Sequence, residues 1–297
     1  MTARTLLSIT TLLAMLAVTS VVPASGQEGG GAPTAQGGRG GRGGAPAFPP
    51  GPIPRRADGK PDLSGIWLGS GGSLTHSAII EDHAGGFGIR AGPSLITDPP
   101  DGIIPYQPWA LAERERRKDD ANGYEDEAAH CERYSIGRLH QFAQDILYSG
   151  NNIIMNVFRE STRVIPMDRK QHLPDGIRLW LGDSLGRWEG DTLVIDSRNF
   201  NEHTRMALGG DFFGPDAHLV ERYTMVDANT ITWTMTVTNP KVFTRPWTIK
   251  SAAPMKRQRA PGPERFDDED SCHEGNVDLI HLKNVYDQTR ANAAHPK

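Results

Sequence analysis

The sequence predicts a mostly β protein in which antiparallel strands form a lipocalin-like barrel with one peripheral helix. Two observations carry this prediction. From Phe142 to Lys256, apolar and polar residues alternate in short runs that are separated by turn residues. Within that stretch Thr230–Thr238 alternates without an error, so Ile231 and Trp233 face a core while the threonines face away. Sheets of this kind are antiparallel and packed on one side, which favours a barrel, with a two-sheet sandwich as the alternative.

The expected strands are rich in β-branched and aromatic residues and are bounded by turn signals. In chain order they are Leu63–Leu68, Asp145–Tyr148, Ile153–Phe158, Thr162–Met167, Leu185–Glu189, Thr192–Asp196, His218–Val226, Thr230–Thr238 and Trp247–Ala252. Turn chemistry joins several of them into hairpins. Ser149–Asn152 forms one turn, and Gly190 takes the first position of a type II′ turn in another. Asp227–Asn229 is expected to be a three-residue loop with Asn229 in the left-handed conformation.

One segment has the features of a helix. Trp109–Asp120 follows Pro108, begins with Ala and Leu, and continues with mixed charges from Glu113 to Lys118. Because acidic and basic residues are interleaved there, we expect its basic cluster to lie on a solvated face. This is the peripheral helix of the predicted fold.

The N-terminal part of the chain divides into two segments before a single domain. Residues 1–26 resemble a secretory signal peptide, because Arg4 precedes the mostly apolar run Leu6–Val22 and small residues occupy the cleavage site. An uncleaved membrane anchor is the alternative. Residues 27–56 form a flexible Gly/Pro-rich linker, the alternative being an RNA-binding tail. Residues 57–297 form one β-rich domain with long N-terminal loops and a C-terminal tail. The predicted location is periplasmic or secreted, without stable membrane insertion after cleavage.

The two cysteines, Cys131 and Cys272, fit a disulfide in an exported chain. In the chain-entropy model a loop of this length stabilises the fold by about 4–5 kcal/mol. Two alternatives remain. A cysteine nucleophile has His130 or His273 adjacent in sequence, and Cys272-His273-Glu274 is a weak candidate for a metal site.

Composition excludes several classes of protein and partner. The chain has 297 residues, of which 37% are hydrophobic and 23% charged, and a net charge of −4. These values exclude a collagen, a coiled coil and a multi-span membrane protein, and they do not favour nucleic acid as a partner. No zinc-peptidase, P-loop or dinucleotide fingerprint occurs, so we predict neither a metal nor a cofactor.

Ionisable residues interrupt the apolar faces of two predicted strands. With a three-residue loop at Asp227–Asn229, Val226 faces Thr230, Tyr223 faces Trp233, and Glu221 lies on the apolar face beside Met235. A loop one residue different would place His218 and Arg222 on that face instead.

Arg163 repeats this pattern, because it shares a strand face with Ile165 and Met167. An inward Glu221 and an inward Arg163 are therefore able to pair. One interpretation is a structural ion pair that fills the barrel. The other is a site in which Glu221 acts as general acid or base and Arg163 or Arg222 holds an anionic ligand group.

Loop residues supply the other candidate contacts. His172 follows the Arg163 strand and is the second candidate proton carrier, and His203 lies in the long loop before the last hairpin. His218 and Trp180 complete the predicted ligand-binding set, Trp180 as a ring on which a sugar or an aromatic group stacks. The alternative for each is an ordinary surface or core residue.

Gly182–Gly186 matches the Gly-x-Ser-x-Gly pattern of hydrolases, but a hairpin follows where that motif needs a helix. Its longer form, Gly182–Val194, resembles the Gly-x-Ser-x-Gly-x-Trp-Glu-Gly-Asp-Thr-Leu-Val core of a large family of exported bacterial proteins. The resemblance extends to Pro61–Trp67, Glu221–Tyr223 and Phe243–Thr248. It implies export and a β-rich fold, but no particular reaction.

The chain departs from that family in two places. The segment after Cys131 lacks a Pro-x-Gly-x-Pro sequence, and Asn201–Gly210 lacks Trp-Leu-Asp, so contacts of these loops are not carried over. The motif also has a purely structural interpretation, since Gly190-Asp191 is a turn and Trp188 faces Leu193.

These observations predict an exported enzyme that acts on a small polar or aromatic molecule, a sugar or a phenolic, by metal-free acid/base chemistry. The reaction would be of the lyase, isomerase or hydrolase type, with Glu221 and His172 as proton carriers. The alternatives are a barrel protein that binds such a ligand without changing it, and a structural envelope protein. The substrate, the reaction and the oligomeric state stay open at this point.

Overall fold

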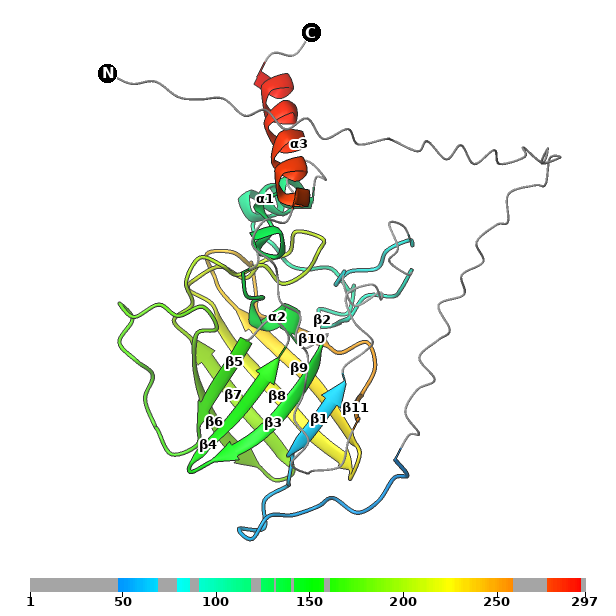
Figure 1. Ribbon diagram of the computed structural model, residues 1–297, viewed down its shortest axis with the longest axis vertical. Helices are drawn as coiled ribbons and strands as arrows, with labels where there is room; N and C mark the ends of the chain where they lie inside the picture. The colour runs from blue at the N-terminus through cyan, green and yellow to red at the C-terminus, as the bar shows by residue number, and fades with distance from the viewer. Residues whose placement is uncertain are drawn as a thin grey trace, which may run out of the picture. The chain divides into compact units, whose positions relative to one another are not determined.

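An antiparallel sheet that curves into a nearly closed barrel dominates the described part of the chain (Figure 1). The computed structural model describes residues 48–68, 79–85, 91–118, 124–130, 132–139, 142–157, 161–258 and 277–294. All of them belong to the unit Gly44–Lys297. The predicted mostly β fold with an antiparallel barrel is confirmed, rather than the sandwich.

The strands fall close to their expected positions. They are β1 (Gly65–Leu68), β2 (Ile96–Asp98), β3 (Ala143–Ser149), β4 (Asn152–Val157), β5 (Ser161–Pro166), β6 (Asp183–Glu189), β7 (Thr192–Arg198), β8 (His218–Asp227), β9 (Thr230–Thr238), β10 (Trp247–Lys250) and β11 (Met255–Arg257). Only β2 and β11, each three residues long, have no counterpart among the predicted strands.

The order of strands around the barrel is β5-β4-β3-β1-β11-β9-β8-β7-β6, and β10 extends the sheet beside β9 and β2. The early strand β1 and the late strand β11 pair in the middle of this order, with Trp67 opposite Arg257. The two end strands, β5 and β6, face each other without a backbone ladder, and we call this gap the seam. Arg163 on β5 crosses it, donating from Nε to Ser184 Oγ on β6 over 3.0 Å.

The longest hairpin has the predicted central register. Tyr223 lies opposite Trp233 and Glu221 opposite Met235, so the alternative register is wrong. The turn differs in detail. Asp227, not Val226, pairs with Thr230, because a bulge turns Val226 out to 56% exposure. Asn229 is not left-handed, since Asn199 is the one non-glycine residue with positive φ in the described part of the chain.

The predicted turn at Gly190 is present, and the φ of 59° at its first position matches a type II′ turn.

The barrel interior is filled by large side chains from the inward faces of the strands. Trp67, Trp233, Trp247 and Tyr223 are each at most 2% exposed. A barrel of this size needs such residues because its interior is just wide enough for side chains.

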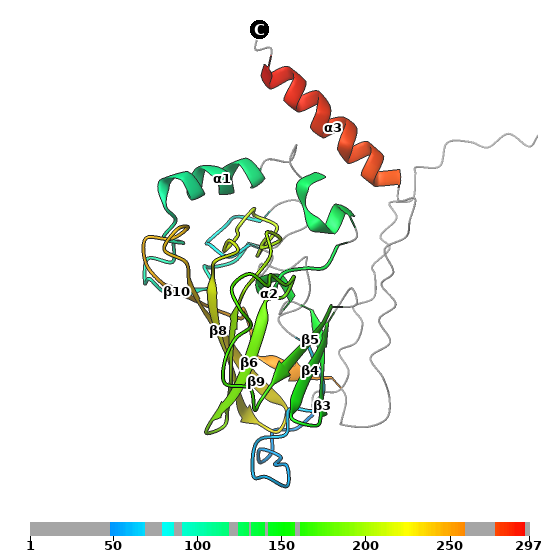
Figure 2. The same ribbon diagram turned by 90° about the vertical axis from the view of Figure 1, so that its left-hand side faces the viewer.

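The helices are α1 (Pro108–Lys118), α2 (Ile136–Leu139) and α3 (Val277–Ala294), with a 3-10 turn at Glu127–His130. α1 is the predicted peripheral helix; Figure 2 shows it at the end of the barrel opposite the β3–β4 turn. The prediction that its basic cluster lies on a solvated face is wrong for Arg114. Arg114 is 7% exposed and binds Glu81 at 2.7 Å and Asp211 at 3.2 Å.

The end of the predicted linker lies against the barrel turns. Ala228 donates its N–H to the Gly51 carbonyl over 3.0 Å, and Arg55 pairs with Asp191 at 2.7 Å. The predicted signal peptide, most of the linker, Cys131 and Cys272 lie outside the described residues. In the described part of the chain, no helix combines the length and the apolar character that crossing a membrane demands.

Candidate functional site

The barrel interior contains the ion pair that the strand patterns predict. Arg163 Nη2 lies 2.5 Å from Glu221 Oε2, with side-chain exposures of 6% and 1%. Both residues face inward because each occupies the same strand face as apolar neighbours, Ile165 on β5 and Met225 on β8. The inward placement of both groups is therefore confirmed.

Polar neighbours satisfy the other atoms of this pair. Glu221 Oε1 accepts hydrogen bonds from Trp233 Nε1 at 3.2 Å and from Tyr223 Oη at 3.3 Å. Arg163 donates to Ser184 Oγ and, over 2.7 Å, to Ser197 Oγ. Burial, and then the Glu221 charge, raise the pKa of Tyr223 well above its usual 10, so its hydroxyl stays a donor.

No room for a substrate surrounds the pair. The cavity that touches Arg163, Glu221, Gln144 and Tyr223 has a volume of about 10 Å³. A space of this size holds at most about one water molecule. The geometry therefore favours the structural interpretation of the ion pair and leaves Glu221 without access to a ligand.

His172 and His218 meet on the outer face of the barrel, on the other side of the sheet from Glu221. His172 Nδ1 is 2.9 Å from Asp183 Oδ2, and its Nε2 is 2.9 Å from Asp196 Oδ1. Asp196 Oδ2 continues the series to His218 Nε2, again over 2.9 Å. We call Asp183, His172, Asp196 and His218 the outer chain. Strand alternation places its β-strand members outward, while Ser184 and Ser197 face inward.

Hydrogen bonds within the outer chain lower the pKa of its two carboxyl groups. Burial alone would raise the pKa of Asp196, but hydrogen bonds and charge interactions with His218 and His172 lower it to about 2. The pKa of Asp183 is also lowered, since bonds from the Leu173 N–H, Arg169 and His172 outweigh its burial. Ionised carboxylates only accept hydrogen bonds, so the donors in the outer chain are ring N–H groups of the two histidines.

A pH dependence of stability follows from Asp196. Because its folded pKa lies below the unfolded value of about 4, its contribution is present above that pH and is lost as the pH falls to about 2. We expect Asp196→Asn to lower the free energy of unfolding by about 1–2 kcal/mol at pH 6, discounted for partial exposure, and by almost nothing at pH 2. Urea titrations across this range measure the difference. The exposed Asp175→Asn variant is the control, and a pH-independent difference for Asp196→Asn would contradict the assignment.

A cleft of about 380 Å³ lies over the seam. Its polar lining residues come from β5, β6, the loop between them and the segment before α2, and are Arg133, Thr162, Arg163, Arg169, Asp183 and Ser184. Trp180 forms an aromatic wall. Its Nε1 donates to the Arg133 carbonyl over 2.9 Å, and its ring stacks on His203 with centroids 4.0 Å apart and planes 13° apart. We call this space the seam cleft.

Positive charge predominates in the seam cleft. Arg169 pairs with Asp183, and Arg163 pairs with Glu221. The exposed Arg133 side chain forms no hydrogen bond or ion pair with the residues that the structure describes. Its guanidinium is free to bind a carboxylate or phosphate through two parallel hydrogen bonds.

The structure brings some of the predicted residues together and separates others. Arg163 and Trp180 line the seam cleft, and His203 stacks on Trp180. His172 lies one contact behind Asp183 and does not meet Glu221. His218 belongs to the outer chain, on the outer face. Arg222 is also on the outer face, where it binds Glu189 at 2.6 Å.

Sequence reasoning missed three charged members of the cleft, Arg133, Arg169 and Asp183. The sequence offered a reason to include Arg169 and Asp183, because both flank the loop of His172 and Asp183 lies within the Gly-x-Ser-x-Gly motif. It offered none for Arg133, since this residue comes from a segment distant in the chain, whose Arg133 carbonyl accepts the bond from Trp180.

The Gly-x-Ser-x-Gly motif closes the barrel at the seam. Gly182 has a φ of 66°, and Gly186 leaves room for Met167 and Ile165, whose Cγ2 would lie 2.8 Å from an added Cβ. Ser184 bonds Arg163 and Ser197, and no histidine is among its described partners. The motif therefore has a structural role here, in agreement with the hairpin that follows it.

Comparison with known proteins gives no family to which the chain belongs. No family model, curated protein or solved structure matches it. The resemblance to exported bacterial proteins thus stays a prediction.

Proposed function

We propose that the protein is an exported small-molecule-binding protein whose seam cleft holds a small anion that carries a flat ring. The observation that carries this proposal is the meeting, in one cleft of about 380 Å³, of the Trp180 ring, which His203 backs, with an Arg133 guanidinium that has no partner among the described residues. Pockets for small ligands have volumes from about 300 Å³ upward, so the size is suitable.

Charge determines the class of ligand. Asp183 and Glu221 neutralise two of the three arginines, and Arg133 leaves a positive charge at the mouth of the cleft. A carboxylate is the simplest group that this charge would hold. The flat ring is inferred from Trp180, whose orientation is fixed by its bond to the Arg133 carbonyl.

Calorimetry with simple ring acids tests this proposal. We expect 4-hydroxybenzoate to bind, and its uncharged amide and the ringless anion acetate to bind at least about tenfold more weakly, because each lacks one recognised group. Arg133→Gln and Trp180→Ala are expected to weaken 4-hydroxybenzoate binding by a similar factor. Arg222→Gln, which removes an arginine from the outer face, is the matched control and leaves the dissociation constant unchanged. Equal affinities for the acid and the amide would refute an anion site.

The outer chain favours an acid/base enzyme, of the lyase, isomerase or hydrolase type, as the second candidate. Asp183 lines the seam cleft and begins a series of hydrogen bonds through His172 and Asp196 to His218. Such a series is suited to moving a proton between a bound ligand and solvent. Mass spectrometry of bound ligands incubated with the protein tests it, since turnover should be lost in His172→Asn while binding persists. Binding without turnover leaves the first candidate alone.

A further inference from the structure

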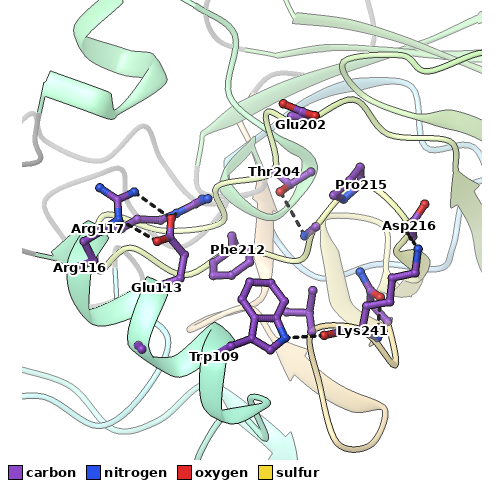
Figure 3. A pocket seen from close by; sticks show the side chains of 14 residues that line it. Trp109, Glu113, Arg116, Arg117, Glu202, Thr204, Phe212, Pro215, Asp216 and Lys241 are labelled. Carbon is purple, nitrogen blue, oxygen red and sulfur yellow. Dashed lines mark hydrogen bonds and ion pairs between the residues drawn. The ribbon is translucent and has the colours of Figure 1, made fainter.

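A second pocket, of about 640 Å³, lies beside α1 (Figure 3). One wall is a face of α1, and the others are loops of residues 202–216 and 239–242. It shares no lining residue with the seam cleft. Neither the ion pair in the barrel nor the outer chain reaches it, so its chemistry is independent of the proposed anion site.

An exposed, fixed indole forms the platform of this pocket. Trp109 is 56% exposed. Its Nε1 nevertheless donates a hydrogen bond to the Lys241 carbonyl over 3.0 Å, and this bond holds the ring in one orientation. Phe212 lies behind it with ring centroids 6.2 Å apart. The Arg117 guanidinium covers Phe212 at 4.3 Å, so Trp109 provides the aromatic surface that a ligand meets.

Charges around the platform balance. The rim carries three acidic and three basic residues, and they are Glu113, Glu202, Asp216, Arg116, Arg117 and Lys241. Most of them pair with each other, as Figure 3 shows for Glu113 between Arg116 and Arg117, both at 2.7 Å. Lys241 binds Asp216 at 2.7 Å. A strongly charged ligand would have to displace one of these partners.

Glu202 is the exception on the rim. Its side chain is exposed and makes no hydrogen bond or ion pair with the described residues. A carboxylate accepts two or more hydrogen bonds, and neighbouring hydroxyls of one ligand can supply them. Its negative charge also disfavours an anion in this pocket, unlike Arg133 in the seam cleft.

We propose that this pocket binds a neutral saccharide. The electron-rich face of Trp109 attracts the partly positive C–H groups on one face of a sugar ring. The ionised rim groups donate to and accept from the hydroxyls at the ring's edge. The six charged rim groups offer hydrogen-bond partners that a ring bearing hydroxyls would use and that a purely aromatic ligand would leave unused. The volume accommodates one or two sugar rings.

An array of neutral and acidic saccharides, probed with the labelled full-length protein, tests this proposal. We expect neutral saccharides to be retained and to remain bound by the Trp180→Ala variant, whose change lies in the seam cleft. Calorimetry with the best neutral saccharide should then show at least a tenfold loss of affinity in Trp109→Ala and a smaller loss, about threefold to tenfold, in Glu202→Gln. Both residues are exposed, so both variants are expected to fold.

Three results would overturn the saccharide proposal. They are no neutral saccharide above background, retention of acidic saccharides alone, or equal affinity of Trp109→Ala and the unaltered protein. The loss of affinity in Trp109→Ala and Glu202→Gln is independent of the seam cleft, because Arg133 and Trp180 are unchanged in these two variants. Conversely, failure of 4-hydroxybenzoate to bind leaves the Trp109 pocket untouched.

Discussion

Glu221→Gln is expected to lower the free energy of unfolding by about 3–5 kcal/mol, the usual cost of removing one partner of a buried ion pair. Glutamine still accepts hydrogen bonds from Trp233 and Tyr223, so the loss isolates the charge. It leaves Arg163, 5% exposed, without a counter-charge in the barrel. Urea denaturation followed by circular dichroism measures the change.

Two further variants identify the cause of this loss. Glu189→Gln removes an exposed carboxylate that also binds an arginine, Arg222 at 2.6 Å, and is expected to cost less than about 1 kcal/mol. The double variant Arg163→Met with Glu221→Leu replaces the whole pair by apolar groups and should recover most of the stability. If Glu221→Gln is no more destabilising than Glu189→Gln, the claim that the Glu221 charge stabilises the fold by balancing Arg163 is refuted.

Gly182→Ala is the second large effect, and we expect a loss of about 3 kcal/mol. The backbone there has a φ of 66°, which costs an alanine about 1–2 kcal/mol. An added Cβ would also lie 2.5 Å from Phe200 Cε1 and 2.6 Å from the Arg198 carbonyl oxygen, and crowding of this kind costs about 1–3 kcal/mol. Thermal and urea denaturation both report the change.

Gly190→Ala is the matched control for this variant. Gly190 has nearly the same φ, 59°, but no atom lies within 4 Å of an added Cβ. It should therefore show the backbone cost alone, about 1–2 kcal/mol. Equal losses in the two variants would mean that Phe200 and Arg198 move to accommodate the added Cβ. Steric crowding would then not be the reason for a glycine at position 182.

The register of the barrel hairpins could be predicted because it depends on local alternation. In Thr230–Thr238 each side chain's face follows from its neighbours, and Glu221 and Arg163 were found by the same rule. The bulge at Val226 was missed, since one extra residue in a turn changes the pairing of a single position and leaves the rest of the pattern intact.

Features that depend on distant segments could not be predicted. β11 is too short to show a period, and it forms only because β1 and β9 each offer it an edge. Arg114 looks solvated within its helix, but Asp211, which binds it, comes from a loop almost a hundred residues later. The sequence analysis took the C-terminal helix α3 for a tail because its apolar residues do not form a single stripe along the helix.

The candidate site divides in the same way. Arg163 and Trp180 were predicted individually, whereas the seam cleft that unites them exists because β5 and β6 end the sheet side by side. His172 was singled out as a loop residue, but its bonds to Asp183 and Asp196 depend on the outer face of a hairpin whose curvature no local pattern describes.

The pairing of β1 with β11 means that the sheet cannot be completed until nearly the whole chain is available. Residues at positions 67 and 257 must meet before the middle of the sheet is continuous, and nearly two hundred residues separate them. A polypeptide emerging from a ribosome or a translocation pore therefore completes its hairpins early but keeps two bare strand edges until the last strand arrives. Truncation before Met255 should leave those edges open to other chains, so we expect shortened products to aggregate.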